Sequence, residues 1–133
     1  MGLIVVDAGI IIAILDSSDA HHGPARDALR GAIGDGSDLV LPASAYAEVL
    51  VAPFRQDTDS AKVVDSLIDA LPATVQPITR PIARAAAELR ALHGTRLRLP
   101  DALVVATAIE LGAECLLTTD RRWPDVGMKV HAI

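Results

Sequence analysis

The sequence predicts an α/β fold in which a central parallel β-sheet is flanked by α-helices within a single domain. Short apolar or β-branched runs alternate with longer segments whose apolar residues recur at helical spacing. The length of 133 residues fits one hydrophobic core. No Gly-, Pro- or Ser-rich stretch is long enough to be an interdomain linker. We therefore treat residues 1–133 as one domain.

The predicted elements follow one another as expected for βαβ units. The strands, which are short and rich in Val, Leu or Ile, are expected at residues 3–6, 39–41, 74–78, 115–118 and 129–132. Apolar residues at helical spacing predict helices over residues 60–71 and 82–92. Residues 102–111 are apolar nearly all round, which predicts a buried helix that ends at Gly112. Breaks are expected at residues 34–37, at Pro53 and at Gly94.

Charge and aromatic content narrow the possible functions. A net charge of -5 argues against a general nucleic-acid binder that works by neutralising phosphates. The scarcity of aromatic residues argues against a platform on which bases stack, so any nucleic acid would be held mainly by its phosphates. Several arginines nevertheless leave open a local basic rim beside an acidic pocket. They are Arg96, Arg98, Arg121 and Arg122.

The hydrophobic content of 51% is high for a small protein, and two interpretations remain open. Apolar surface is left for a partner, or the core is rich in Ala and Val. The apolar residues 3–15 are too short to span a membrane, contain Asp7 and follow no basic segment, so we expect a folded element of a cytoplasmic protein. Cys115, the only cysteine, is expected to be a core residue without a disulfide.

Four acidic residues lie where apolar segments end or begin. Asp7 follows the first predicted strand, and Asp120 follows the strand predicted over residues 115–118. Asp101 opens the helix before that strand, and Glu48 lies on the helical segment after the second strand. Because open parallel sheets bind ligands at the carboxyl ends of their strands, we expect the four acids to meet at this edge.

Taken singly, these acids have structural explanations that stay open. Asp7 and Asp101 also suit helix caps or first-turn acids, and Asp120 also suits a turn. Glu48 is harder to explain, because no cation lies one helical turn away. Four carboxylates about 4 Å apart would repel by roughly 4 kcal/mol per pair, more than the ~0.5–2 kcal/mol that one cap returns. Such a cluster predicts a divalent cation, Mg2+ or Mn2+ rather than Zn2+, because no His or Cys lies among the acids.

Four blocks of the sequence resemble a known family in their order and spacing. They are Val5-Val6-Asp7-Ala8, Ala47-Glu48-Val49, the run from Leu99-Pro100-Asp101-Ala102 to Ala108, and Leu117-Thr118-Thr119-Asp120-Arg121-Arg122-Trp123. The chain resembles PIN domains and, more narrowly, the VapC-type ribonuclease toxins of bacterial toxin–antitoxin pairs. The resemblance covers nearly the whole chain, with one departure. Members often carry Ser or Thr two residues after the first Asp, where this chain has Gly9.

The resemblance implies a PIN-like fold, endoribonuclease activity that depends on Mg2+ or Mn2+, a homodimer and a cognate antitoxin. Asp7, Glu48, Asp101 and Asp120 then become both the catalytic residues and the metal ligands. One or two ions would activate a water for in-line attack on an RNA phosphodiester, leaving a 5'-phosphate. The missing hydroxyl at Gly9 implies weaker activity or lower metal affinity.

Some roles and functions remain open at this point. Arg121 and Arg122 either hold flanking phosphates of the substrate or lie in a solvated turn. Thr119 either hydrogen-bonds the metal shell or simply ends the strand. Two other functions compete with the toxin: a housekeeping PIN nuclease without an antitoxin, and a PIN-like binding module without cleavage. Gly9 favours the binding module, and the complete set of acids favours the enzyme.

Overall fold

The computed structural model describes residues 2–133 and confirms the predicted α/β fold. Five parallel strands form one sheet in the order β3-β2-β1-β4-β5. The strands are β1 Leu3–Val6, β2 Asp38–Pro42, β3 Ala73–Gln76, β4 Cys115–Thr118 and β5 Val130–Ala132. The predicted bounds of β1, β2, β4 and β5 are therefore correct to within one residue. Strand β3 begins one residue earlier and ends two residues earlier than expected.

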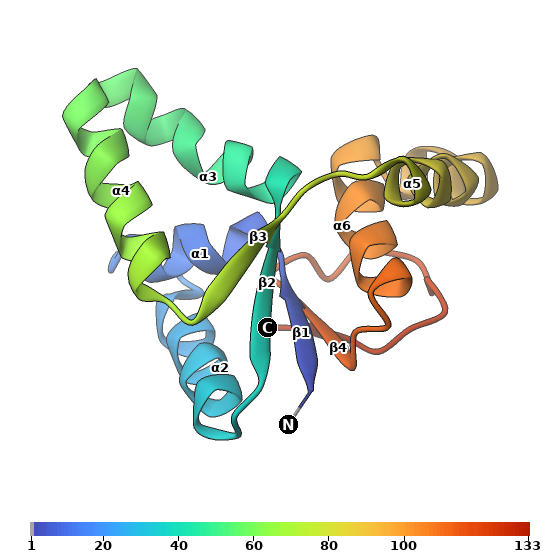
Figure 1. Cartoon of the computed structure of the whole chain (residues 1–133), viewed down its shortest axis with the longest axis horizontal. Helices are drawn as coiled ribbons and strands as arrows, with labels where there is room; N and C mark the ends of the chain where they lie inside the picture. The colour runs from blue at the N-terminus through green and yellow to red at the C-terminus, as the bar shows by residue number, and fades with distance from the viewer. Residues whose placement is uncertain (1) are drawn as a thin grey trace.

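Helices cover both faces of the sheet (Figure 1). They are α1 Ala8–Leu15, α2 His22–Gly34, α3 Ala43–Gln56, α4 Thr58–Ala70, α5 Arg80–His93 and α6 Leu99–Glu110, with a short 3-10 turn, η1, at Gly94–Arg96. In Figure 1, α1 and α2 lie on one side of the sheet, and α6 lies on the other with α5 outside it. None of the helices in the described range has both the length and the apolar character needed to cross a membrane.

The core lies where the central strand β1 and its neighbour β4 meet α6. Val5 of β1 and Leu116 of β4 are completely buried, as is Val105 of α6. A strand covered on both faces has no solvent-facing side, which is why β1 and β4 are continuous apolar runs. Complete burial of one such side chain stabilises the fold by about 1.5–3 kcal/mol.

The strand order determines which residues lie together at the carboxyl edge of the sheet. From β1 the chain moves to β2 and β3 on one side, and later to β4 and β5 on the other. Val6 pairs in register with Leu117, and the backbone N–H of Asp7 donates to the carbonyl of Leu117 at 2.9 Å. Asp7 therefore lies beside the residues that follow β4, at the crevice where open parallel sheets bind ligands.

The prediction of a break at Pro53 is wrong, because α3 continues through it to Gln56. A proline near the end of a helix removes one backbone donor without ending the helix at once. The chain breaks at Asp57, where φ is -171°. The expected break at Gly112 is confirmed: this residue has a positive φ of 64°, and its N–H donates to Ile109 while that of Ala113 donates to Ala108.

Candidate functional site

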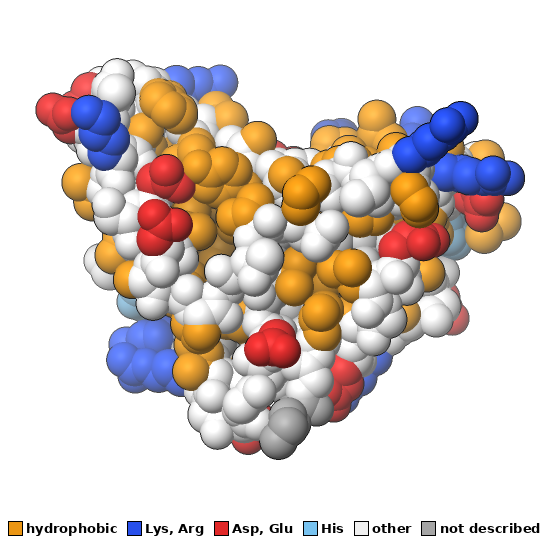
Figure 2. Space-filling view, in the orientation of Figure 1, with side chains coloured by type: hydrophobic (Ala, Val, Ile, Leu, Met, Phe, Trp, Pro, Cys, Tyr) orange, Lys and Arg blue, Asp and Glu red, His pale blue; other side chains and the backbone are white. Residues whose placement is uncertain are grey.

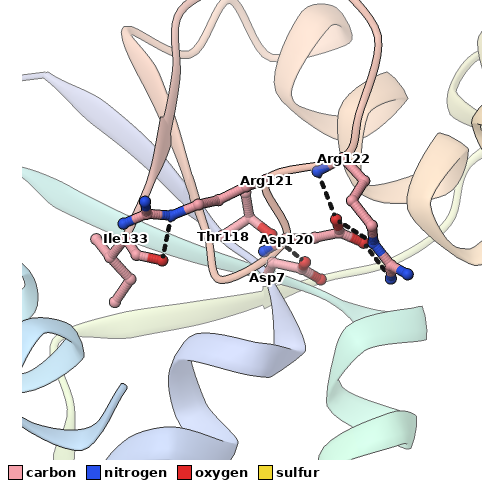
Figure 3. A network of polar contacts seen from close by, with 6 residues as sticks. All are labelled: Asp7, Thr118, Asp120, Arg121, Arg122 and Ile133. Atoms are coloured by element: carbon pink, nitrogen blue, oxygen red, sulfur yellow. Dashed lines mark hydrogen bonds and ion pairs between the residues drawn. The ribbon is translucent and has the colours of Figure 1, made fainter. Parts of the chain in front are cut away.

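Asp7 lies at the junction of β1 and α1 and is only 8% exposed. Its Oδ1 accepts a hydrogen bond from the N–H of Ala8 at 2.8 Å, and its Oδ2 accepts one from the hydroxyl of Thr118 at 2.7 Å (Figure 3). Burial raises the pKa of Asp7, the two hydrogen bonds oppose this, and the charge of Asp120 raises it further. Within residues 2–133, no Lys or Arg forms an ion pair with this carboxylate.

Glu48 and Asp101 reach the same edge from α3 and α6. Burial, and then repulsion from Asp7 and Asp101, raise the pKa of Glu48, although Glu48 as a whole residue is exposed at the rim. Burial, and then Asp7 and Asp120, raise the pKa of Asp101, while Trp123 and Arg98 lower it. Each acid therefore lies close enough to Asp7 to be repelled by it.

Asp120 follows β4 and has a positive neighbour. Burial alone would raise the pKa of Asp120, but hydrogen bonds and the charge of Arg122 outweigh it and leave the pKa lowered. The Nε and Nη2 atoms of Arg122 each lie 3.3 Å from an oxygen of Asp120. Because Asp120 also raises the pKa of Asp7 and Asp101, it belongs to the same cluster of acids.

The cluster is not a closed cage. No group of three or more His, Cys, Asp or Glu side chains in the described chain is spaced to hold a metal ion as the side chains stand. Two of the carboxylates have partners of their own, because Asp120 pairs with Arg122 and Asp7 accepts hydrogen bonds from Ala8 and Thr118.

The donor set nevertheless fits a hard divalent cation. It consists of carboxylate oxygens beside a threonine hydroxyl, which are the oxygen ligands that Mg2+ and Mn2+ prefer. The raised pKa values of Asp7, Glu48 and Asp101 indicate excess negative charge at this edge. A bound cation would relieve it.

A cavity of about 450 Å³ adjoins two of the acids, Asp101 and Asp120. It is lined by Thr95, Arg96, Arg98, Asp101, Asp120, Arg122 and Trp123. Acidic side chains therefore share one cavity with a basic rim, as the spacing of the arginines suggested. This arrangement suits a phosphate chain whose reacting group lies near the carboxylates.

Two residues without a role in the sequence analysis help to build the site. Thr118 orients Asp7. The indole N–H of Trp123 is buried without a hydrogen bond of good geometry within residues 2–133, yet it lies near enough to lower the pKa of both Asp101 and Asp120. The one sequence feature that pointed to Thr118 and Trp123 was their place in the Leu117–Trp123 block.

The two adjacent arginines point in different directions. Arg122 pairs with Asp120, whereas the Nε of Arg121 donates to the carbonyl of Ile133 at 3.4 Å. Figure 3 shows the two side chains on opposite sides of the Asp120 turn. Only Arg122 lines the cavity that contains Asp101.

Solved structures with a similar fold include three toxins or toxin complexes. VapC20 of Mycobacterium tuberculosis, a sarcin-ricin loop cleaving toxin, is 19% identical with a TM-score of 0.68, over 85% of this chain and 86% of that chain. A toxin–antitoxin complex from Klebsiella pneumoniae is 21% identical with a TM-score of 0.74, over 98% and 99% of the two chains. VapBC2 from Rickettsia felis, bound to a DNA fragment from its promoter, is 12% identical with a TM-score of 0.74, over 98% of each chain.

At these identities the similarity concerns the fold. No curated protein matches the chain. The PIN domain family model, by contrast, matches residues 4–129, which include the four acids and the strands that carry them. The chain therefore belongs to the PIN-domain family.

Proposed function

We propose that this protein is a metal-dependent endoribonuclease toxin that acts in the cytoplasm and is neutralised by a cognate antitoxin. The observation that carries the proposal is the group of mutually repelling carboxylates of Asp7, Glu48, Asp101 and Asp120, two of which, Asp101 and Asp120, line a cavity rimmed by arginines. Like charges gathered at the ligand-binding edge of a sheet destabilise the fold and are typical of functional sites. The similar fold of VapC20, a toxin that cleaves the sarcin-ricin loop, supports RNA as the substrate.

In this mechanism the four acids would hold one or two Mg2+ or Mn2+ ions. When bound, such an ion polarises the scissile phosphate and lowers the pKa of the attacking water. Thr118 keeps the carboxylate of Asp7 oriented, and the N–H of Trp123 lies close to Asp101 and Asp120. No protein nucleophile takes part.

The basic rim would bind the phosphates on either side of the reacting group. We assign this role to Arg96, Arg98 and Arg122, which line the cavity with Asp101. Arg121 donates a hydrogen bond to the carbonyl of Ile133, so it would bind phosphates only of a substrate that extends toward the C-terminal strand. Specificity would then depend on RNA shape and phosphate positions, since the chain has few aromatic residues for base stacking.

Cleavage of structured RNA tests this proposal. Incubation with tRNA or ribosomal RNA and Mn2+ or Mg2+ should give fragments with a 5'-phosphate, and EDTA should stop the reaction. Duplex DNA under the same conditions should remain intact. Fragments that end in a 2',3'-cyclic phosphate would contradict the mechanism, because they arise from attack by the 2'-hydroxyl of the RNA itself.

Two apolar surfaces support the proposed partners. A groove of about 520 Å³ runs between α1, α3 and α4, and its lining includes Ile12, Leu15, Val49 and Val63. Another face of α3, which includes Tyr46 and Phe54, borders a hollow of about 530 Å³. Apolar side chains gather over the α3–α4 arm in Figure 2. Val63 is 62% exposed and Phe54 58% exposed.

We assign the groove to the antitoxin and the other face of α3 to a second copy of the chain. The similar structure from Klebsiella pneumoniae is a toxin–antitoxin complex, and apolar surface of this extent favours a covering partner. The core is also rich in Ala and Val, so the hydrophobic residues are divided between the core and the exposed surface.

A housekeeping nuclease and a binding module remain the competing functions. A small antitoxin gene immediately upstream would separate the toxin from the housekeeping nuclease. A binding module would be stabilised by Mn2+ yet leave RNA intact, so the cleavage assay separates it from both enzymes. Gly9 is the residue that favours the module.

A further inference from the structure

Gly9 faces Thr119 across the carboxyl edge of the sheet. Gly9 lies in the first turn of α1, and Thr119 lies between Thr118 and Asp120 after β4. A Cβ atom at position 9 would collide with the hydroxyl oxygen of Thr119, and it would lie 3.4 Å from the Cβ of Thr119 and 3.5 Å from its Cγ2. The hydroxyl of Thr119 therefore occupies the space into which a side chain at position 9 would point.

The backbone does not explain why position 9 is glycine. The glycines with positive φ are Gly36, Gly94, Gly112 and Gly127, and Gly9 is not among them. Glycine inside a helix destabilises it by roughly 0.5–1 kcal/mol relative to alanine. The structural feature that favours glycine here is the side chain of Thr119, which fills the space that a Cβ at position 9 would need.

The hydroxyl of Thr119, which lies next to Asp120 in the chain, has no hydrogen-bond partner within residues 2–133. The neighbouring Thr118, by contrast, already donates to Asp7. The Thr119 hydroxyl points at the first turn of α1, which begins directly after Asp7. A neutral hydroxyl oxygen at this position can hydrogen-bond the water shell of a cation, and it adds no negative charge to the repulsion among the carboxylates.

We propose that Thr119 is a positioning residue of the metal site and supplies, from the β4 side, a hydroxyl in the space that Gly9 leaves open. This inference rests on the proposed metal-dependent function, and it replaces the expectation that Gly9 leaves the site short of a hydroxyl. Gly9 and Thr119 form a coupled pair: the glycine makes room, and the threonine fills it.

Metal binding to the full chain, without RNA, tests the role of the hydroxyl. Thr119→Val keeps the shape of the side chain but removes the hydroxyl, and we expect it to weaken Mn2+ binding about 10-fold or more, as loss of an outer hydrogen-bond partner does. Thr119→Ser keeps the hydroxyl and should bind Mn2+ nearly as the wild type does. Calorimetric titration measures the affinities, and thermal melting in EDTA verifies that each variant is folded.

Moving the hydroxyl across the gap gives a sharper test. Gly9→Ser combined with Thr119→Ala places a hydroxyl on α1 and clears the space for it, so the double variant should regain most of the Mn2+ affinity that Thr119→Ala loses. In EDTA, Gly9→Ser should lower the melting temperature when Thr119 is present and raise it when residue 119 is Ala. Such a change of sign is the signature of two residues that compete for one space.

The outcomes separate this inference from the proposed function. If the wild type binds Mn2+ and Thr119→Val binds it equally well, Thr119 has no role in the metal site and the inference is wrong while the function stands. Additive effects of the changes at positions 9 and 119 would also overturn it. A wild-type chain that does not bind Mn2+ at all would overturn the proposed function and, with it, this inference.

Discussion

At the scale of single residues, the acidic cluster places like charges where they destabilise the folded protein. Burial, Asp7 and Asp120 raise the pKa of Asp101. A folded state with a raised carboxyl pKa binds protons more tightly than the unfolded state, so stability rises as the pH falls through that pKa and declines as the pH rises. The full penalty is therefore present at neutral pH when no cation is bound.

Removing one of these charges should stabilise the metal-free protein. We expect Asp101→Asn to melt at a higher temperature than the wild type in EDTA at neutral pH. The difference should vanish as the pH falls below the ordinary aspartate pKa of about 3.9. The variant should also lose RNA cleavage and the stabilisation that Mn2+ gives by binding the folded state. Thermal melts with and without Mn2+ measure both effects.

Glu88 provides the control for this experiment. It is an exposed acid of α5 paired with Arg84, so Glu88→Gln should change neither stability nor cleavage appreciably. If Asp101 acts only as a helix-end residue, Asn caps nearly as well. An Asp101→Asn variant that still cleaves RNA and still responds to Mn2+ would falsify the assignment.

The bond from Thr118 to Asp7 should matter more than other buried threonine bonds. Thr118→Val leaves Oδ2 of a buried carboxylate without its donor, and we expect it to reduce the free energy of unfolding by about 1–3 kcal/mol. Thr107 is equally buried, but its hydroxyl donates to the carbonyl of Leu103 within α6. Thr107→Val should therefore reduce the free energy of unfolding by less, roughly 0.5–1.5 kcal/mol. Urea denaturation in EDTA compares them, and equal losses would contradict this account.

At the scale of elements, α3 and α4 are joined through one residue. Asp57 ends α3, and its Oδ1 accepts a hydrogen bond from the N–H of Ser60 in α4 at 2.6 Å. The backbone and side-chain hydrogen bonds of Ser60 lower the pKa of Asp57. A lowered carboxyl pKa contributes stability that is present above the unfolded-state pKa and is lost as the pH falls through the folded-state pKa.

The cap at Asp57 therefore predicts a pH-dependent difference. Asp57→Asn keeps a side-chain acceptor but does not titrate, so the wild type should melt at the higher temperature at neutral pH and lose this advantage as the pH falls below about 4. Asp57→Ala, which has no acceptor, should melt at a lower temperature than either at neutral pH. Thermal melts between neutral and acid pH measure the difference, and a constant gap between wild type and Asn would show that the charge does not contribute.

At the scale of the whole molecule, the α3–α4 arm carries the apolar groove that we assign to the antitoxin. Val63→Glu places a charge in this groove. Because Val63 is 62% exposed, the melting temperature should change little. Co-purification with the small protein encoded immediately upstream should be lost, since burying the new charge opposes binding.

Leu92 supplies the matched control. It is 76% exposed on α5 and lies outside the groove. Leu92→Glu should therefore co-purify with the partner as the wild type does. If Val63→Glu does the same, the groove is not the antitoxin site.

Features that depend on neighbours along the chain could be predicted from the sequence. The apolar runs identified β1 and β4, the all-round apolar pattern identified the buried α6, and Gly112 marked its end. The strand ends also placed Asp7 and Asp120 at one edge. Local patterns were less informative in two places. Helix α2 was not predicted. At Pro53 a break was predicted, but the loss of one backbone N–H donor did not outweigh the packing of α3.

The sequence by itself determined the fold class, the strand-end positions of Asp7 and Asp120, and the helices on which Glu48 and Asp101 lie. Only the tertiary structure decided which side chains meet. Thr118 and Asp7 are 111 residues apart and form a hydrogen bond because β4 lies beside β1, and for the same reason Thr119 meets Gly9. The pairing of strands brings these groups together through contacts that no local pattern of residues encodes.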